Sequence, residues 1–152
     1  MTADQLAMSE SAPRWVRSGS STKAEASEAI AEALSGILPQ GASASEPPAL
    51  VIAFLSPIYP LPAMARELRI ALGDVPFIGC STSGELSNGS SLRQGLVLWA
   101  LGGSGFSVRV GLGQGVAGSL RQAARDAAGC LDALPSHPHR ALVLLADGLC
   151  GD

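Results

Sequence analysis

Two short apolar runs on either side of an amphipathic segment constrain the fold of this chain more than any other feature. Ala49 to Leu55 is continuously apolar and lies between prolines, as expected of a strand that is covered on both faces. Leu61 to Leu72 carries its apolar residues on one helical face, and Gly73 follows where a helix would end. Val75 to Gly79 is the second apolar run. This strand-helix-strand order predicts an α/β fold with a right-handed parallel crossover.

Two more helices and one more buried strand are predicted. Lys23 to Leu38 has alanine, leucine and isoleucine at helical spacing, and Pro39 ends the pattern. Ser119 to Leu134 repeats this spacing with alanine and leucine. Ala141 to Ala146 is a short apolar run and predicts the last buried strand.

The remaining segments predict the other strands of the sheet. Arg14 to Arg17 predicts a short edge strand, followed by a polar turn at Ser18 to Thr22. Leu96 to Leu101 and Phe106 to Leu112 flank Gly102 to Gly105, which predicts a β-hairpin. We therefore expect a mixed, mainly parallel β-sheet with flanking helices.

The length of 152 residues fits one domain with a core of its own. Residues 1–17 form a polar leader that includes the candidate edge strand, and residues 18–152 form the domain. Asp152 comes directly after the turn that follows the last predicted strand, where an α/β protein would normally continue. We therefore expect this domain to be incomplete at its carboxyl end.

Composition excludes several classes of protein. Hydrophobic residues make up 47% of the chain and charged residues 15%, which favours a globular protein over a disordered one. The formal net charge is −3 and the arginines are dispersed, which argues against nucleic-acid binding. Met1 to Ala12 lacks the features of a secretory signal, and no apolar run approaches the roughly 20 residues of a membrane-spanning helix. We expect a cytoplasmic protein with neither a membrane nor a nucleic-acid partner.

The strand that ends near Gly79 leads into a cluster of small polar side chains. The segment Gly79 to Glu85 reads G-C-S-T-S-G-E, so three hydroxyls and one thiol lie between two glycines. A turn of this kind at the carboxyl end of a strand presents N–H and hydroxyl groups to a small polar molecule. The segment therefore predicts a ligand-contacting turn.

This signature, together with the strand Ala49 to Pro57 upstream and the segment Leu142 to Leu149 downstream, resembles the N-terminal part of the FIST sensory domain family, the FIST N domain. The three segments span most of the chain from about Ser18 onward, and their order and spacing make the match specific. The resemblance implies a bacterial signal-input module that binds a small ligand, with amino acids as candidates. It also implies a second FIST half or a signalling partner. We expect no enzymatic activity, no cofactor and no metal.

The expected ligand-binding residues lie at the signature turn and at the Asp-Gly turn after the last predicted strand. Glu85 and Asp147 both lie near predicted strand ends, so they could converge on the ammonium group of a ligand. Each also has a structural explanation, because Asp-Gly is a favoured turn dipeptide and Glu85 could face solvent or cap a helix. The candidate residues are Gly79, Cys80, Ser81, Thr82, Ser83, Gly84, Glu85, Asp147 and Gly148.

The alternative is a fragment of an enzyme that uses Cys80 or a bound nucleotide. The turn has the glycine spacing of a phosphate loop, but Glu85 replaces the required lysine. It also begins like a nucleophile elbow, but Ser83 replaces the required glycine. Cys80 would need a base, and we expect His137 and His139 at the opposite end of the sheet.

A glycine motif and the three cysteines are further candidates for a nucleotide site and a metal site. Gly113 to Gly118 is a literal G-x-G-x-x-G between a predicted strand and a predicted helix, as in dinucleotide binding. The fingerprint also expects an acidic residue about 20 positions later, at the end of the second strand, but the candidate there, Asp147, lies well beyond that distance. Cys80, Cys130 and Cys150 are odd in number and lack the paired spacing of a zinc site, so they predict neither a disulfide framework nor a metal site.

Overall fold

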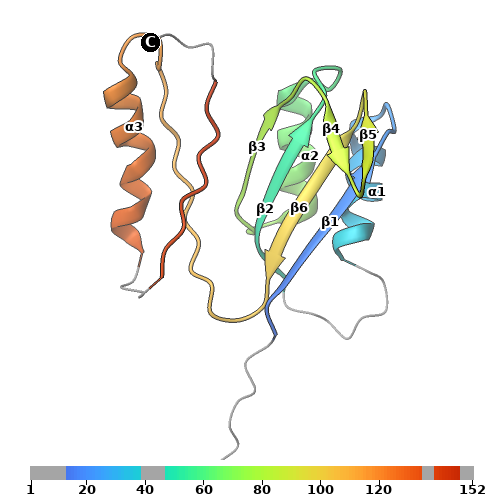
Figure 1. Cartoon of the computed structure of the whole chain (residues 1–152), viewed down its shortest axis with the longest axis horizontal. Coiled ribbons are helices and arrows are strands. Elements are labelled where there is room, and N and C mark those ends of the chain that lie inside the picture. The colour runs from blue at the N-terminus through green and yellow to red at the C-terminus, as the bar shows by residue number, and fades with distance from the viewer. Residues whose placement is uncertain (1–12, 39–46, 135–138, 148–152) are drawn as a thin grey trace, which may run out of the picture.

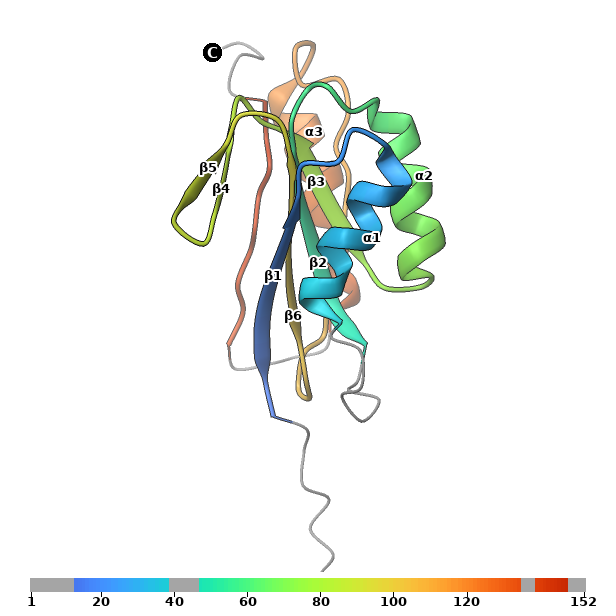
Figure 2. The ribbon, with the colours of Figure 1, turned by 90° about the vertical axis from the view of Figure 1, so that its right-hand side faces the viewer.

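A four-stranded sheet with helices on one face forms the body of the protein, and a small two-stranded sheet stands at one end of it (Figures 1 and 2). The structure is a computed structural model that describes residues 13–38, 47–134 and 139–147. Its elements are β1 (Trp15–Ser21), α1 (Ala26–Ile37), β2 (Pro48–Leu55), α2 (Leu61–Leu72), β3 (Phe77–Ser81), β4 (Glu85–Ser87), β5 (Ser90–Leu92), β6 (Leu96–Gly102), α3 (Leu120–Ala128) and a 3-10 turn at Gly129–Ala133.

The strand order of the main sheet is β1-β6-β2-β3. β6 is antiparallel to both of its neighbours, and β2 with β3 is the one parallel pair among the described strands. The prediction of a mixed α/β fold is confirmed, but the prediction of a mainly parallel sheet is wrong. The reason is the path of the chain after β3, where the β4–β5 hairpin reverses its direction. β6 then starts beside the carboxyl ends of β1 and β2 and runs back between them (Figure 1).

The core lies between the sheet and the two helices α1 and α2, which cover one of its faces (Figure 2). The strand residues that join this core recur at every second position, which is the period of a strand. They are Val51, Ala53 and Leu55 of β2 and Leu96, Leu98 and Ala100 of β6. The helices contribute Ala29, Ile30, Ala33, Leu34 and Ile37 of α1 and Met64, Leu68 and Leu72 of α2. Burial of one leucine or isoleucine stabilises the fold by about 1.5–3 kcal/mol, so this layer holds the body together.

α1 and β1 touch at one point without side chains between them. A Cβ atom on Gly19 would lie 1.8 Å from the carbonyl oxygen of Ala33, and one on Gly36 would lie 2.9 Å from the Cα of Gly19. Beside this contact, the guanidinium of Arg17 donates to the carbonyl oxygen of Ile37 at 2.9 Å. Glycine at these positions lets the helix approach the strand backbone directly.

Most predicted elements of the body are confirmed. The helix expected over Lys23 to Leu38 is α1, and the strand-helix-strand unit is β2, α2 and β3, with β2 inside the sheet as expected. β1 is the predicted edge strand, but it continues to Ser21 through the predicted turn, because all seven of its residues pair with β6. No helix in the described ranges has the length and apolar character needed to cross a membrane.

The hairpin predicted between Leu96 to Leu101 and Phe106 to Leu112 is wrong. β6 forms as expected, but it pairs with β1 along one edge and with β2 along the other. It therefore has no free edge for residues 106–112. The chain leaves the sheet after Gly102, and the described hairpin is formed by β4 and β5 instead.

The strand predicted over Ala141 to Ala146 is also wrong. Its side chains at Leu142, Val143 and Leu144 are 65%, 51% and 69% exposed, and the segment forms no regular element. We call the described residues 106–134 and 139–147 the α3 segment. Figure 1 shows its extended parts, 106–115 and 139–147, running beside α3 beyond the β3 edge of the sheet. An apolar run becomes a strand only where a neighbouring backbone pairs with it, and neither part belongs to a described sheet.

Candidate functional site

The G-C-S-T-S-G-E signature is divided between a strand, a turn and the start of a hairpin. Its first three residues belong to β3, and Glu85 is the first residue of β4. The backbone N–H of Thr82 donates to the carbonyl oxygen of Leu55 at 2.9 Å, which extends the pairing of β3 with β2 by one residue. The turn at 82–84 therefore starts from a fixed point at the carboxyl end of the parallel pair.

Gly79 serves the sheet rather than the turn. It lies inside β3 opposite Ala53, and a Cβ atom on it would come within 2.7 Å of the carbonyl oxygen of Ala53. Gly84, in contrast, has room for a side chain, because the nearest atom to a Cβ placed there would be the carbonyl oxygen of Leu92 at 3.9 Å. The close approach of β3 to β2 thus explains the first glycine of the signature.

An Asn-Gly turn positions Glu85. Asn88 and Gly89 have φ values of 47° and 80°, and they connect β4 to β5 as the two central residues of a tight hairpin. Asn-Gly is the dipeptide that best tolerates positive φ at both positions, so residues 88 and 89 are a hairpin signal in the sequence. The hairpin pairs Glu85 with Leu92, and β4 packs against β6, so Glu85 is fixed at the end of the main sheet.

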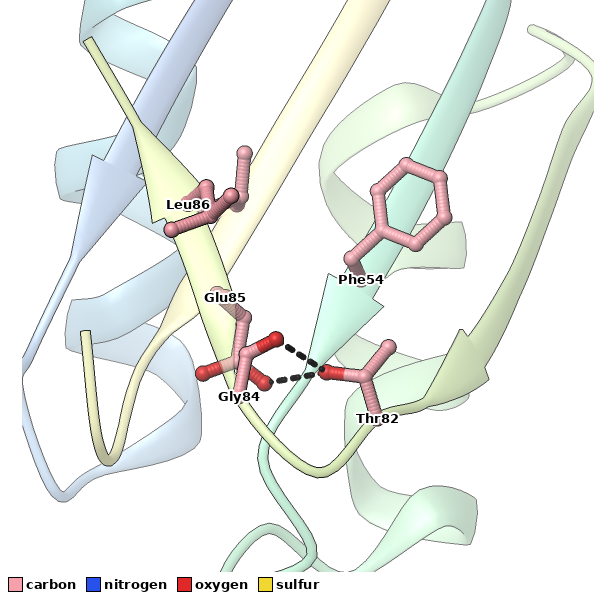
Figure 3. Close-up of a pocket in the computed structure, with 6 residues that line it drawn as sticks. Phe54, Thr82, Gly84, Glu85 and Leu86 are labelled. Atoms are coloured by element: carbon pink, nitrogen blue, oxygen red, sulfur yellow. Dashed lines mark hydrogen bonds between the residues drawn. The ribbon is translucent and has the colours of Figure 1, made fainter. Parts of the chain in front are cut away.

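Glu85 is buried with one oxygen paired and the other unpaired. Its side chain is 3% exposed, and the hydroxyl of Thr82 donates to its Oε1 at 2.6 Å (Figure 3). The carbonyl oxygen of Gly84 lies farther from the same hydroxyl, at 3.4 Å, and a hydroxyl has only one hydrogen to donate. Oε2 is buried and has no hydrogen-bond partner. A buried carboxylate oxygen of this kind is unusual and requires an explanation.

A cavity of about 250 Å³ lies beside this carboxylate. Phe54, Glu85 and Leu86 surround it in Figure 3. Leu86 is 79% exposed and therefore stands at the opening of the cavity toward solvent. The full lining consists of Phe54, Thr82, Gly84, Glu85, Leu86 and Val97. The lining therefore combines Thr82, Gly84 and Glu85 of the signature with the apolar side chains of Phe54, Leu86 and Val97.

Tyr59, in the loop between β2 and α2, is electrostatically coupled to this site. It is 2% exposed, and its hydroxyl donates to the carbonyl oxygen of Lys23 at 2.5 Å. Burial raises the pKa of Tyr59 above its ordinary value of 10.0, and the negative charges of Glu85 and Glu32 raise it further. Glu32 accepts a hydrogen bond from the buried Ser21 at 2.5 Å. Two carboxylates, Glu85 and Glu32, therefore act on Tyr59 at this end of the sheet.

The other predicted site residues that the structure describes are not part of the cavity lining. Ser81 and Ser83 are exposed, and Cys80 is a free, partly buried thiol. Asp147 is exposed and is not part of the cavity lining, whereas Gly148 lies outside the described residues. The structure thus gathers Thr82, Gly84 and Glu85 around one cavity, and a ligand role for the full predicted set stays a prediction.

The structure removes the context that the dinucleotide fingerprint requires. Residues 113–118 do precede α3, and Ser119 caps that helix by accepting from the N–H of Gln122 at 3.3 Å. The residues before them, 106–112, form no strand. No group of three or more histidine, cysteine, aspartate or glutamate side chains in the described ranges is placed to hold a metal ion. His137 and Cys150 lie outside those ranges.

Four site residues were missed from the sequence, namely Phe54, Tyr59, Leu86 and Val97. The core residues of β2 occupy the odd positions from Val51 to Leu55, so the pleat places Phe54 on the opposite face. The same alternation in β6 places Val97 on that face. The period of two could have identified this pair, and the Asn-Gly turn could have placed Leu86 beside them.

Comparison with known protein families identifies the family of this chain. The family model of the FIST N domain matches residues 49–152, which is more than half of the chain. The matched range starts in β2 and includes the signature turn, the cavity lining and the α3 segment. A search of curated proteins finds no match. On the strength of the family match, this chain belongs to the FIST N domain family.

Proposed function

We propose that this chain is the ligand-binding part of a sensory input domain and that it acts without catalysis. The FIST N domain is generally a sensory, signal-transduction domain. The observation that carries the proposal is the cavity beside Glu85, since three residues of the signature, Thr82, Gly84 and Glu85, line it. Its ligand is a small polar metabolite, with amino acids and related compounds as candidates.

The hairpin supplies a mechanism for signalling. Leu86 of β4 stands at the opening of the cavity, and β4 is joined to the sheet through the turn at 82–84. A ligand that contacts Leu86 and Glu85 together would favour the arrangement in which the hairpin closes over it. This requires the closed arrangement to bind the ligand more tightly than the open one.

The chemistry of the lining supports binding rather than catalysis. A hydrolytic site needs a nucleophile in hydrogen-bond contact with a base. The Thr82 hydroxyl does donate to the Glu85 carboxylate, but the lining has no lysine, arginine, histidine, asparagine or glutamine side chain to stabilise an oxyanion, and Cys80 is absent from it. The described residues that line the cavity therefore resemble a recognition site.

The proposal also includes a partner, either a second FIST half or a signalling protein. Its support is the α3 segment, where large apolar side chains remain exposed. These are Phe106, Val110, Leu112, Leu120, Leu142, Val143 and Leu144. Apolar side chains grouped in this way are typical of an interaction surface. A cytoplasmic location is part of the same proposal and is supported by the three cysteines, which are odd in number and irregularly spaced.

A thermal-shift screen of the full chain against amino acids, amines and small carboxylic acids tests this function. A ligand present at about 100 times its Kd stabilises the folded state by about 2.7 kcal/mol, which raises Tm measurably. Leu86→Trp, at the cavity opening, should abolish the shift. Leu142→Trp, at an exposed apolar position of the α3 segment, is the matched control and should preserve it. A panel without any stabilising compound would contradict the proposal.

A further inference from the structure

The cavity beside the β4–β5 hairpin offers a ligand mostly hydrocarbon. Phe54 of β2 and Val97 of β6 are direct partners across the two strands, so their side chains stand next to each other on the face that lines the cavity. Leu86 adds a third apolar side chain from the hairpin, and the methyl group of Thr82 points toward Phe54 in Figure 3. Four of the six lining residues therefore present carbon to a ligand.

The polar side-chain atoms of the lining are already engaged or buried. Thr82 donates its one hydroxyl hydrogen to Oε1 of Glu85 at 2.6 Å. Oε2 of Glu85 is itself buried, and in Figure 3 it lies on the side of the carboxylate away from Phe54 and Thr82. The remaining lining residue, Gly84, has no side chain. The lining thus has no side-chain donor left for a ligand.

These properties select an uncharged hydrocarbon group. A polar group that enters the cavity loses its hydrogen bonds to water without replacement, and a charged group loses more. An anionic group would also meet the negative charge of Glu85 with no cationic side chain in the lining to offset it. A hydrocarbon group carries no such cost, and each buried methylene strengthens binding.

The size and opening of the cavity limit how much of a ligand can enter. The volume is about 250 Å³, and an apolar cavity of about 150 Å³ is already large enough for benzene. Leu86 is largely exposed at the opening, so the cavity is accessible from solvent on that side. A short chain or a small ring can therefore enter while the rest of the ligand stays in water.

We propose that this cavity binds the uncharged hydrocarbon end of an amphiphilic ligand, about four to six carbon atoms in size, while the polar head of the ligand remains in solvent. The inference rests on the proposed function and makes it narrower. Among amino acids it selects those with aliphatic or aromatic side chains over those with polar or charged ones. Phe54, Leu86 and Val97 contact the hydrocarbon end.

The test uses the full chain and four linear probes that share one terminal hydroxyl group, namely n-pentanol, pentanediol, aminopentanol and hydroxypentanoate. Their other ends are a methyl, a hydroxyl, an ammonium and a carboxylate group. Each is titrated at neutral pH and constant ionic strength, with the amide signals of residues 82–86 followed by NMR. We expect n-pentanol to bind about tenfold or more tightly than the other three, because its methyl end loses no hydrogen bond on burial.

Chain length provides a second measurement on the unaltered protein. From n-propanol through n-butanol to n-pentanol, each added methylene should tighten binding about fourfold, as expected for hydrocarbon that leaves water. Affinities that do not depend on chain length would contradict the inference.

Substitution of Val97 assigns the preference to this cavity. Val97→Ala removes two methyl groups from the lining, and the added space should raise the affinity ratio of n-hexanol to n-pentanol about twofold or more. Val16→Ala, at an exposed valine of β1 outside the lining, is the matched control and should leave this ratio unchanged. The same ratio in all three proteins would count against the inference. If Val97→Ala does not fold, the probe series on the unaltered chain, with Leu86→Trp as the block, still decides the question.

The outcomes separate this inference from the proposed function. Equal binding of the four probes, or tighter binding of a probe with two polar ends, would overturn the preference for hydrocarbon. A metabolite hit that Leu86→Trp blocks would in that case still support the sensory function. The expected n-pentanol preference without any metabolite hit would support the inference for the cavity and contradict the proposed function. Failure of every compound in both series would overturn both proposals.

Discussion

Two segments of nearly the same sequence have opposite fates in this protein. Residues 96–100 read L-V-L-W-A and residues 142–146 read L-V-L-L-A. In the first, Leu98 is 0% exposed within β6, whereas in the second the corresponding Leu144 is 69% exposed and belongs to no strand. Side-chain character cannot explain this difference, because the two leucines have almost identical neighbours in sequence.

Backbone pairing explains it instead. β6 pairs with β1 on one edge and β2 on the other, and this pairing presents alternate side chains to α1 and α2. Residues 142–146 belong to no described sheet, so nothing holds their side chains against a common layer. An apolar run shows which residues gain from burial, and a neighbouring strand decides whether the burial occurs.

Hydrogen exchange should show the largest contrast between the two segments. We expect backbone amides of β6 to exchange about 10³-fold or more slowly than unprotected amides, since opening them requires unfolding of the body. Amides of residues 142–146 should exchange close to the rate of an unstructured peptide. Equal protection of both segments, measured by mass spectrometry, would show that residues 142–146 are paired in solution.

The matched leucines provide the next test. Leu98→Ala should lower the free energy of unfolding by about 2–5 kcal/mol, because it leaves a cavity between β6 and the helices. Leu144→Ala should change it by less than about 0.5 kcal/mol, as is usual at exposed positions. Urea titrations followed by circular dichroism measure both, and similar losses would contradict our description of the α3 segment.

Substitution of two closely packed glycines, one in the body and one in the α3 segment, also compares the two regions. A Cβ atom would lie 1.8 Å from the carbonyl oxygen of Ala33 at Gly19, and 2.1 Å from that of Ala127 at Gly111. Gly19→Ala should destabilise the body by about 1–3 kcal/mol, because α1 must move away from β1. Gly111→Ala introduces a similar clash, but the clash is with α3, which lies outside the body. The free energy of unfolding of the body should therefore be unaffected. Loss of body stability in both variants would show that the two regions unfold as one unit.

The smallest expected effect concerns Tyr59 of the body. Tyr59→Phe removes the hydrogen bond to Lys23 and should cost about 0.5–1.5 kcal/mol at neutral pH. The raised pKa means that the folded state holds the phenol proton more tightly than the unfolded state. This contribution is complete below pH 10.0, the ordinary pKa, and is lost as the pH rises through the folded-state pKa.

Comparing the two proteins isolates that contribution. The difference in the free energy of unfolding between the unaltered chain and Tyr59→Phe should shrink at alkaline pH, because the phenol of Tyr59 then loses its proton. Tyr59 is the one tyrosine of the chain, so no other phenol contributes to this change. Thermal denaturation at a series of pH values measures it. A difference that grows with pH would contradict the direction of the pKa shift.

The sequence was sufficient where local pattern and tertiary structure agree. The amphipathic pattern at Leu61 to Leu72 and the flanking apolar runs predicted α2, β2 and β3 correctly, because the pattern reflects the layer they build. The sequence was insufficient where the availability of a neighbouring strand decides whether an apolar run forms a strand. Phe106 to Leu112 and Ala141 to Ala146 have the composition of strands, but β6 had no free edge for the first of them.

The candidate site shows the same limits. The signature predicted a polar turn, and Thr82, Gly84 and Glu85 do line a cavity. The burial of Glu85 could not be predicted, because it depends on the Asn88-Gly89 turn and on the packing of β4 against β6. The period of two indicates that Phe54 and Val97 lie on the face opposite the core, but their position side by side follows from the register of β2 with β6, which only the assembled sheet defines.

The glycine contact between α1 and β1 bears on how a signal would travel. Gly19 and Gly36 bring the two backbones together, so no flexible side chains lie between them to absorb a displacement. We expect α1 and β1 to move as one rigid piece and to serve as a stationary frame when the cavity fills. Movement would then be confined to the side of the sheet that faces away from α1 and α2. There the β4–β5 hairpin can shift without displacing the helices.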